Sequence, residues 1–167
     1  MIYLYKLESK DLCSIKHFKC DIKLKEFTPS IKNFLLPGEK VSLKTICVRI
    51  LFHVITLGSA RLFYVQSING DLMHTSYVIP ECIKFPFMSR GDYEIGPCYT
   101  YPAYRGKGIY SNVLYGICNK MKNTNPTFYM IVDEANEPSI KGIEKAGFVR
   151  CGVVQKSKFI KRYFKVT

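Results

Sequence analysis

Two strand-like runs joined by Asn69-Gly70 constrain the fold of this chain more than any other feature. Residues 61–68 and 71–79 are rich in β-branched and aromatic side chains. An Asn-Gly pair between two such runs is the strongest short-range hairpin signal, because both residues readily adopt the left-handed backbone of a tight turn. The sequence therefore predicts two neighbouring antiparallel strands.

Further strand-like and helix-like segments surround this hairpin. The expected strands are residues 2–8, 61–68, 71–79, 92–100, 128–132, 149–154 and 163–166. The expected helices are residues 28–36, 41–58, 108–121 and 138–146. The predicted fold class is therefore α+β (mixed α/β), with a central mixed sheet of about seven strands and about four helices on its faces.

The helix expected at residues 41–58 is amphipathic. Its apolar side chains at helical spacing are Leu43, Ile46, Cys47, Ile50, Val54 and Leu57, and its polar side chains on another side are Lys44, Arg49 and His53. A membrane span needs about 20 predominantly apolar residues. We therefore expect the apolar face to pack on the sheet, with an interfacial helix on a membrane surface as the alternative.

The length of 167 residues and the 47% apolar content suit one domain over residues 1–167. No apolar leader with a cleavage site is visible, which predicts a cytoplasmic protein. The seven cysteines are odd in number and form no CxxC pair, which argues against a disulfide framework and a zinc site. His17, His53 and His74 lack the spacing of a metal site or triad and are interpreted as packing or surface residues.

The formal net charge of +12 favours acidic partners. Phosphates, nucleotides, nucleic acid and an anionic membrane surface all fit this charge, and the composition does not choose among them. The basic residues are dispersed, although the segment from Arg150 onward contains no acidic residue. A solvated basic surface is an equally good interpretation.

A glycine-rich loop lies between the strand at 92–100 and the helix that starts near Gly108. The glycines of Arg105-Gly-Lys-Gly108 let backbone amides approach a ligand, and the N-terminus of the helix adds positive potential. Such a loop can hold a diphosphate, with Arg105 and Lys107 adding charge. An ordinary strand-to-helix turn explains the glycines equally well, because the loop matches neither the dinucleotide fingerprint nor the P-loop.

This loop is the first of two motifs in a characteristic order. Tyr101-Pro-Ala-Tyr-Arg-Gly-Lys-Gly-Ile109 is followed by Asn136-Glu-Pro-Ser-Ile-Lys-Gly-Ile-Glu-Lys-Ala-Gly-Phe148. Together they resemble the GCN5-related N-acetyltransferase (GNAT) superfamily over residues 92–154. A Gly-Pro pair inside a strand predicts a bulge or an edge, and the resemblance makes Gly96-Pro97 the bulge that splays two parallel strands. Residues 1–60 correspond to the variable part, where such enzymes bind their acceptors.

The resemblance implies acetyl-CoA as the co-substrate, without a metal, and assigns residues to its binding. Strand residues would pair with the pantetheine arm, loop amides would hold the pyrophosphate, and two residues would open the second helix beside the cofactor. The strand residues are Cys98, Tyr99 and Thr100, the loop residues are Arg105, Gly106, Lys107, Gly108, Ile109 and Tyr110, and the helix residues are Asn136 and Ser139.

Two departures from the family pattern affect the assigned roles. Ala103 replaces the Gln or Arg of the common loop, but the loop acts mainly through its backbone. Ile143 stands where many members have the Tyr that protonates the departing thiolate. Tyr110 or Tyr99 would have to replace that acid, or solvent would exchange the proton.

The resemblance implies direct attack of an amine on the thioester, with the amides of residues 98–100 stabilising the oxyanion. Glu94, followed by Ile95, resembles the base of the histone-acetylating branch. An exposed carboxylate is a weak base, so Glu94 would need burial or a water relay, and a surface strand carboxylate is the alternative reading. An acyl-cysteine route through Cys98 is disfavoured, because direct transfer is the family habit.

The residues around the loop look most like acetyltransferases that act on amino sugars of nucleotide-linked precursors. Such an acidic acceptor would also suit the positive charge. The alternatives are a protein or peptide amine and a catalytically silent CoA-binding module. A nucleic-acid or membrane-surface binder is a third class, with salt-sensitive affinity. The identity of the acceptor, and whether the chain is a monomer or a homodimer, stay open.

Overall fold

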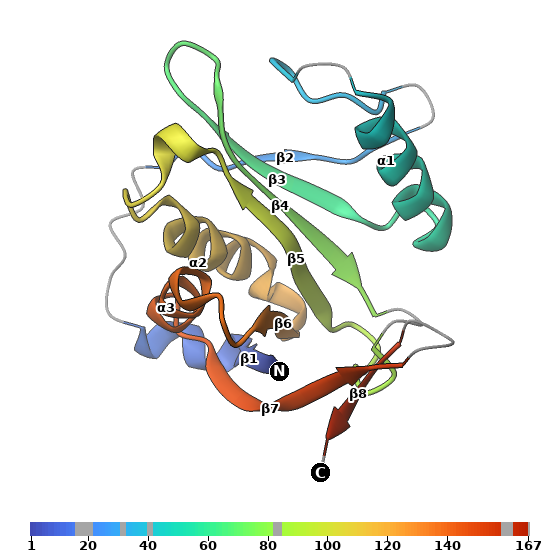
Figure 1. Cartoon of the computed structure of the whole chain (residues 1–167), viewed down its shortest axis with the longest axis vertical. Helices are drawn as coiled ribbons and strands as arrows, with labels where there is room; N and C mark the ends of the chain where they lie inside the picture. Colours follow the sequence, from blue (N-terminus) through green and yellow to red (C-terminus); the bar gives the residue numbers. More distant parts are fainter. Residues whose placement is uncertain (16–21, 31–32, 40–41, 82–84, 158–161, 167) are drawn as a thin grey trace.

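A computed structural model of the chain describes residues 1–15, 22–30, 33–39, 42–81, 85–157 and 162–166. The described strands form one mixed sheet in the order β2-β3-β4-β5-β6-β1-β7-β8 (Figure 1). They are β1 Ile2–Glu8, β2 Lys25–Phe27, β3 Arg61–Gln66, β4 Leu72–Pro80, β5 Tyr93–Thr100, β6 Thr127–Asp133, β7 Val149–Lys156 and β8 Tyr163–Val166. The α-helices are α1 Leu43–Ile55, α2 Ile109–Met121 and α3 Glu137–Lys145, and the 3-10 helices are η1 Ser9–Ser14, η2 Pro102–Tyr104 and η3 Lys122–Thr124.

The hairpin predicted at Asn69-Gly70 is confirmed. β3 and β4 pair antiparallel, and residues 67–71 make the turn. The Gly70 amide donates to the Ser67 carbonyl at 3.0 Å, and Gly70 has a φ of +87°, which favours glycine. The turn is longer than the two-residue form, because the register shifts between Val65 and Gln66.

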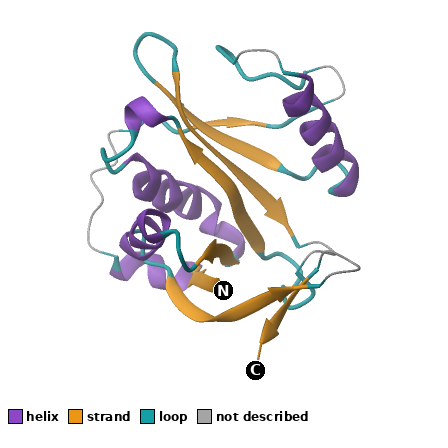
Figure 2. Ribbon diagram, in the orientation of Figure 1, coloured by secondary structure: helices purple, strands orange, loops and turns teal. Residues whose placement is uncertain are grey.

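Helices cover both faces of the sheet, which confirms the mixed α/β class (Figure 2). Helices α2 and α3 lie on one face, and α1 lies over β3 and β4 on the other (Figure 1). The apolar spacing of α2 buries Val113, Leu114 and Ile117 in the main core, together with Ile95 of β5 and Phe128 of β6. This packing fixes the end of β5 against the start of α2.

β5 and β6 separate where the sequence predicts a bulge. They pair in parallel only at Tyr93↔Phe128 and Glu94↔Tyr129. The pairing of β5 with β4 shifts register around Gly96-Pro97, because two residues of β5 there face one of β4. The predicted splay is therefore confirmed, and none of the described strands lies beside β5 on this edge beyond Glu94.

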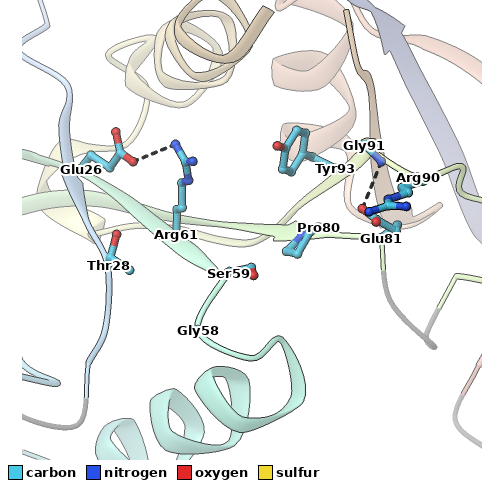
Figure 3. Close-up of a pocket in the computed structure, with 10 residues that line it drawn as sticks. All are labelled: Glu26, Thr28, Gly58, Ser59, Arg61, Pro80, Glu81, Arg90, Gly91 and Tyr93. Carbon is cyan, nitrogen blue, oxygen red and sulfur yellow. Dashed lines mark hydrogen bonds and ion pairs between the residues drawn. The ribbon is translucent and has the colours of Figure 1, made fainter. Parts of the chain in front are cut away.

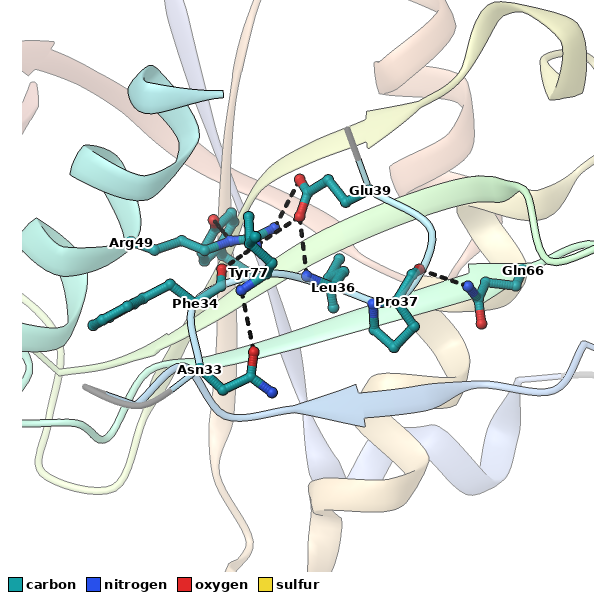
Figure 4. A network of polar contacts seen from close by, with 9 residues as sticks. Asn33, Phe34, Leu36, Pro37, Glu39, Arg49, Gln66 and Tyr77 are labelled. Carbon is teal, nitrogen blue, oxygen red and sulfur yellow. Dashed lines mark hydrogen bonds and ion pairs between the residues drawn. The ribbon is translucent and has the colours of Figure 1, made fainter. Parts of the chain in front are cut away.

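The prediction that the apolar face of α1 packs on the sheet is wrong. Leu43, Val54 and Leu57 are 81%, 63% and 91% exposed, whereas Arg49 is only 2% exposed. The guanidinium of Arg49 faces the sheet because it pairs with both carboxylate oxygens of Glu39, at 2.6 and 3.0 Å (Figure 4). Within the described residues, no helix is long and apolar enough to cross a membrane.

The helix predicted at residues 28–36 is also wrong. Among the described residues 28–30 and 33–36 none is helical, and Ser30 and Asn33 form an isolated antiparallel bridge. The backbone of this segment bonds to side chains instead: the Leu36 amide donates to Glu39, and Arg49 donates to the Phe34 carbonyl (Figure 4). The short edge strand β2, which pairs with β3, was not expected from the sequence.

Candidate functional site

A cavity of about 670 Å³ lies between the end of β5, the start of α2 and helix α3. Every predicted cofactor-binding residue except Lys107 lines it: Cys98, Tyr99, Thr100, Arg105, Gly106, Gly108, Ile109, Tyr110, Asn136 and Ser139. Lining residues that were not predicted are His74, Tyr104, Ser111, Pro138, Lys141, Gly142 and Lys145. The structure thus brings the two sequence motifs to one cavity.

The glycine loop forms a cradle of backbone amides at the start of α2. Gly106 and Gly108 have φ angles of +73° and +71°, and Gly108 caps α2 without a side-chain acceptor. The first amides of a helix have no intrahelical partner. A Cβ built on Gly106 would meet nothing within 4 Å, so open space lies over the loop. The Arg105 amide already donates to the Pro102 carbonyl, so the amides from Gly106 onward suit a diphosphate.

Positive charge surrounds this cradle unevenly. Arg105 is tied back to β5, because its Nε donates to the Thr100 carbonyl at 3.0 Å. The Lys107 ammonium lies 5.3 Å from the centre of the Tyr104 ring and outside the cavity wall. Lys141 and Lys145, one helical turn apart on α3, line the cavity. They were not predicted, and the signal that could have found them is their spacing of one helical turn on the helix that Asn136 starts.

Asn136 and Ser139 define the start of α3. The Asn136 side chain accepts a hydrogen bond from the Ser139 amide at 3.3 Å, which caps the helix. Both residues line the cavity, so this helix also directs its positive end toward it. The helix cap alone is therefore enough to explain an Asn at 136 and a Ser at 139, and a ligand in the cavity is a second explanation.

A buried polar cluster lies on the cavity wall. His74, interpreted from the sequence as a packing or surface residue, is a buried member of this cluster and also lines the cavity. His74 is opposite Thr100 and Ser76 is opposite Cys98 in the pairing of β4 with β5. His74 and Ser76 are fully buried. Burial lowers the pKa of His74 to about 4 and raises the pKa of the Cys98 thiol to about 12, so both are uncharged at neutral pH.

Tyr110 reaches this cluster from α2. Its ring centre lies 5.8 Å from that of His74, and burial raises the pKa of its hydroxyl well above the usual value. The ring occupies space that Gly142 leaves open, since a Cβ on Gly142 would lie 2.5 Å from its Cδ1. Ile143, where the resemblance places Tyr, is 1% exposed in the main core. Tyr110 of α2 therefore brings a phenol to the cavity, next to the part of α3 where Ile143 replaces the Tyr of the family pattern.

Glu94 lies where β5 and β6 begin to separate. It is 3% exposed, so the reading as a surface carboxylate is wrong. Its Oε1 lies 3.9 Å from where a Cβ on Gly96 would be. The next residue, Ile95, packs against α2, so the Glu94 side chain points to the opposite face of the sheet. Glu94 does not line the cavity.

A second cavity, of about 610 Å³, lies near the start of β5 (Figure 3). Arg61 and Arg90 line it together with Glu26 and Glu81, and Arg61 pairs with Glu26 at 3.1 Å. None of the predicted site residues lines this cavity. No group of three His, Cys, Asp or Glu in the described part of the chain is placed to hold a metal ion.

The burial of His74 predicts a pH-dependent stability. The unfolded chain binds a proton on this residue near pH 6.5 and the folded chain only near pH 4, so acidification across this window favours unfolding. Relative to His74→Gln, wild type is expected to lose about 3 kcal/mol of unfolding free energy over that window. Urea unfolding at several pH values measures the difference. Equal slopes for the two proteins would contradict a neutral buried His74.

Comparison with known proteins agrees with the two motifs. Residues 62–148, just over half of the chain, match the family model described as the acetyltransferase (GNAT) family. The comparison with curated proteins gave no match. A functionally unknown conserved protein from Staphylococcus epidermidis ATCC 12228 is 15% identical, covering 90% of this chain and 57% of its own, with a TM-score of 0.53.

Two other solved structures share the fold. AAC(6′)-Ib in complex with paromomycin and acetyl-CoA is 15% identical, covering 94% of this chain and 87% of its own, with a TM-score of 0.55. A tandem GNAT protein from the clavulanic acid biosynthesis pathway is 14% identical, covering 89% of this chain and 50% of its own, with a TM-score of 0.57. The chain thus spans just over half of the Staphylococcus protein and half of the tandem protein. By its family match, the chain belongs to the acetyltransferase (GNAT) family, as its two motifs predicted.

Proposed function

We propose that the chain transfers the acetyl group of acetyl-CoA to the primary amine of a small molecule. The observation that carries this proposal is a single cavity that joins the amide cradle of Gly106 and Gly108 to the unpaired edge of β5. Acetyl-CoA supplies an activated acetyl group at one end and a diphosphate at the other. The described residues offer a matching group for each.

The diphosphate end is matched by amides and by lysines. The amides of residues 106–110 and the N-terminus of α2 favour an anion, and Lys141 and Lys145 add charge from the facing helix. Because the loop acts through its backbone, Ala103 does not weaken this assignment. We place diphosphate binding here, in the proposed core over residues 92–154.

Two amides of β5 are suited to the acyl end. The Tyr101 amide donates to the Met73 carbonyl of β4 at 3.0 Å. Successive amides along a strand point to opposite edges, so those of Cys98 and Thr100 point away from β4, to the open edge. They are therefore the candidates to pair with the pantetheine arm and to stabilise an oxyanion. The Tyr99 amide points to β4.

Buried Glu94 is the candidate base. The carboxylate is buried, as a carboxylate in this role would need to be. Its side chain points to the face that carries α1, where we place the acceptor, together with residues 1–60. The amine and the thioester would then meet at the bulge from opposite faces of the sheet.

Tyr110 is the candidate acid, and its removal should lower turnover. Tyr110→Phe is expected to reduce kcat for thiol release about 100-fold, because the departing sulfur loses its proton donor. Acetyl-CoA affinity should change by less than about twofold, since the diphosphate contacts remain. Steady-state kinetics and calorimetric titration measure the two quantities. Gly142→Ala should also lower kcat, because its Cβ would displace the ring.

Tyr99→Phe is the matched control for the acid. Tyr99 is 49% exposed and stacks edge-on against Tyr101, on the face of β5 opposite to Cys98. Its loss is expected to leave kcat within about twofold. A large loss in this variant, with none in Tyr110→Phe, would exchange the two assignments.

The acceptor that we rank first is a nucleotide-linked amino sugar, because its phosphates suit a chain of charge +12. A protein or peptide amine is the second class. The buried Ile143 favours a further candidate, a CoA-binding module without turnover. Thiol release from acetyl-CoA, measured with nucleotide-linked amino sugars, aminoglycosides and lysine peptides, tests all three. Binding of acetyl-CoA without release by any amine would leave the silent module.

A further inference from the structure

Helix α1 and the turn that follows it carry a row of apolar side chains on the outside of the protein. In the described part of the chain, half of the exposed large apolar side chains lie between Leu43 and Leu57. They are Leu43, Ile50, Leu51, Val54, Ile55 and Leu57. Cys47, which is also exposed, completes the helical spacing of this outer face of α1. An exposed apolar patch of this kind ordinarily marks an interaction site.

The fold holds this apolar face outward. Arg49, on the other side of the helix, is only 2% exposed. Its guanidinium binds the Glu39 carboxylate, the Phe34 carbonyl and the Tyr77 hydroxyl (Figure 4). The apolar residues could turn toward the sheet only if these contacts broke, and the buried carbonyl and carboxylate would then lose their donor. Exposure of the outer face is therefore built into the packing of the helix.

Leu57 extends the outer face at a cost to the backbone. Its φ of +49° is left-handed, which is unfavourable for a bulky side chain and is usually left to Gly or Asn at the end of a helix. Leu57 is also 91% exposed, so packing within the protein does not offset this cost. A large apolar side chain in a strained and exposed position suggests a contact outside the protein.

The charge of the chain indicates which kind of partner suits this face. Residues 40–70 contain no Asp or Glu, and the exposed Lys44 lies one helical turn from Cys47. The net charge of the chain is +12. Two copies of the chain would repel each other, whereas a lipid surface with anionic headgroups would attract the protein. Charge complementarity therefore favours an anionic bilayer over a second copy.

The position of α1 leaves the candidate site free. α1 lies over β3 and β4, on the face of the sheet opposite to α2 and α3 (Figure 1). The cavity of the glycine loop lies between β5, α2 and α3. A protein held through the outer face of α1 would therefore keep this cavity open.

We propose that the outer face of α1 docks the protein on the surface of an anionic lipid bilayer. The helix lies along the surface, its apolar side chains enter the boundary between headgroups and acyl chains, and Lys44 contacts the headgroups. None of the residues of this face lines the cavity of the glycine loop, so the inference does not rest on the proposed function.

A tryptophan reporter tests the contact directly. The chain contains no Trp, so Leu51→Trp places a single indole on the outer face of α1. Its fluorescence is expected to shift to the blue with vesicles of phosphatidylcholine and phosphatidylserine at about 0.1 M salt, and to stay unchanged at about 1 M salt. Val149→Trp is the control, because Val149 is similarly exposed on β7, toward the other end of the sheet.

Substitutions test whether the apolar face carries the binding. Val54 and Val149 are 63% and 58% exposed, so Val54→Gln and Val149→Gln form a matched pair. In cosedimentation with the same vesicles, Val54→Gln is expected to weaken binding about tenfold, and Val149→Gln should stay within about twofold of wild type. Equal losses in the two variants would overturn the assignment to α1.

Leu57→Asn separates binding from folding. Asn adopts the left-handed backbone more readily than Leu, so the melting temperature should stay unchanged or rise. Binding to the vesicles should nevertheless fall about tenfold, because the apolar side chain is lost. Unchanged binding by this variant would contradict the role of the strained Leu57.

The reporter also distinguishes the other occupants. A blue shift of Leu51→Trp that grows with protein concentration without vesicles would mean that a second copy covers the face, and would overturn the proposal. An equal shift with phosphatidylcholine alone would overturn the role of anionic lipid. Absence of a shift with either kind of vesicle would overturn membrane docking and leave the proposed acetyl transfer untouched.

Discussion

Gly106→Glu is expected to weaken the binding of acetyl-CoA at least about 100-fold. The Gly106 backbone is left-handed at φ +73°, which strains any side chain, and the new carboxylate would enter the open space over the amide cradle. A carboxylate there repels a diphosphate and excludes it from the amides. Isothermal titration of the folded variant with acetyl-CoA measures the loss.

Gly91→Glu is the matched control for this experiment. Gly91 has a φ of +94°, and a Cβ there also meets open space, but it lies near the start of β5, outside the cavity of the glycine loop. The variant carries the same added charge and a similar backbone strain, so acetyl-CoA binding should stay within about twofold of wild type. Equal losses in both variants would point to general unfolding, and unchanged binding by Gly106→Glu would move the diphosphate away from the loop.

Arg49→Ala is expected to lower the free energy of unfolding by about 3–5 kcal/mol. Arg49 is 2% exposed and binds the Glu39 carboxylate, the Phe34 carbonyl and the Tyr77 hydroxyl (Figure 4). Its removal would leave a partly buried carboxylate and a carbonyl without their donor. Urea unfolding followed by circular dichroism measures the change.

Lys44→Ala provides the control on the same helix. Lys44 is exposed, so its loss should change the free energy of unfolding by less than about 0.5 kcal/mol. Joint replacement by Arg49→Met and Glu39→Leu should recover part of the loss, because no buried charge is then left alone. A loss below about 1 kcal/mol in Arg49→Ala would mean that this ion pair does not hold α1 to the sheet.

Local signals predicted most of the sheet. The Asn69-Gly70 turn, the Gly96-Pro97 interruption and the apolar spacing of α2 each depend on neighbours in sequence, and each is confirmed. Strand β2 could not be predicted in the same way. Its three residues carry no periodicity, and its pairing with β3 supplies the order that the local sequence lacks.

The orientation of α1 could not be predicted from residue spacing, for a different reason. Its apolar residues form a clear stripe, and a stripe ordinarily faces the core. Here Arg49 faces inward because Glu39 and the Phe34 carbonyl, from the preceding segment, form a binding site for it. That site exists only in the folded chain, so residue spacing alone pointed to the wrong face.

In the candidate site too, residues in contiguous motifs could be predicted from the sequence, and residues that meet only in the folded chain could not. The loop and the start of α3 are contiguous motifs, and the structure brings their residues, apart from Lys107, to one cavity. His74 was not placed in the site because its partner Thr100 comes from another strand. The two residues meet only through the register of β4 with β5, which also brings Ser76 to Cys98. The signal that could have found it is a His-x-Ser run in the strand before a Cys-x-Thr run.

A crystal structure of the chain with acetyl-CoA tests the central claim most directly. The account predicts the pyrophosphate on the amides of residues 106–110 and the pantetheine arm between β5 and β6, with the thioester oxygen near the Cys98 or Thr100 amide. Acetyl-CoA bound in the second cavity, beside Arg61 and Arg90, or found nowhere on the protein, would contradict it.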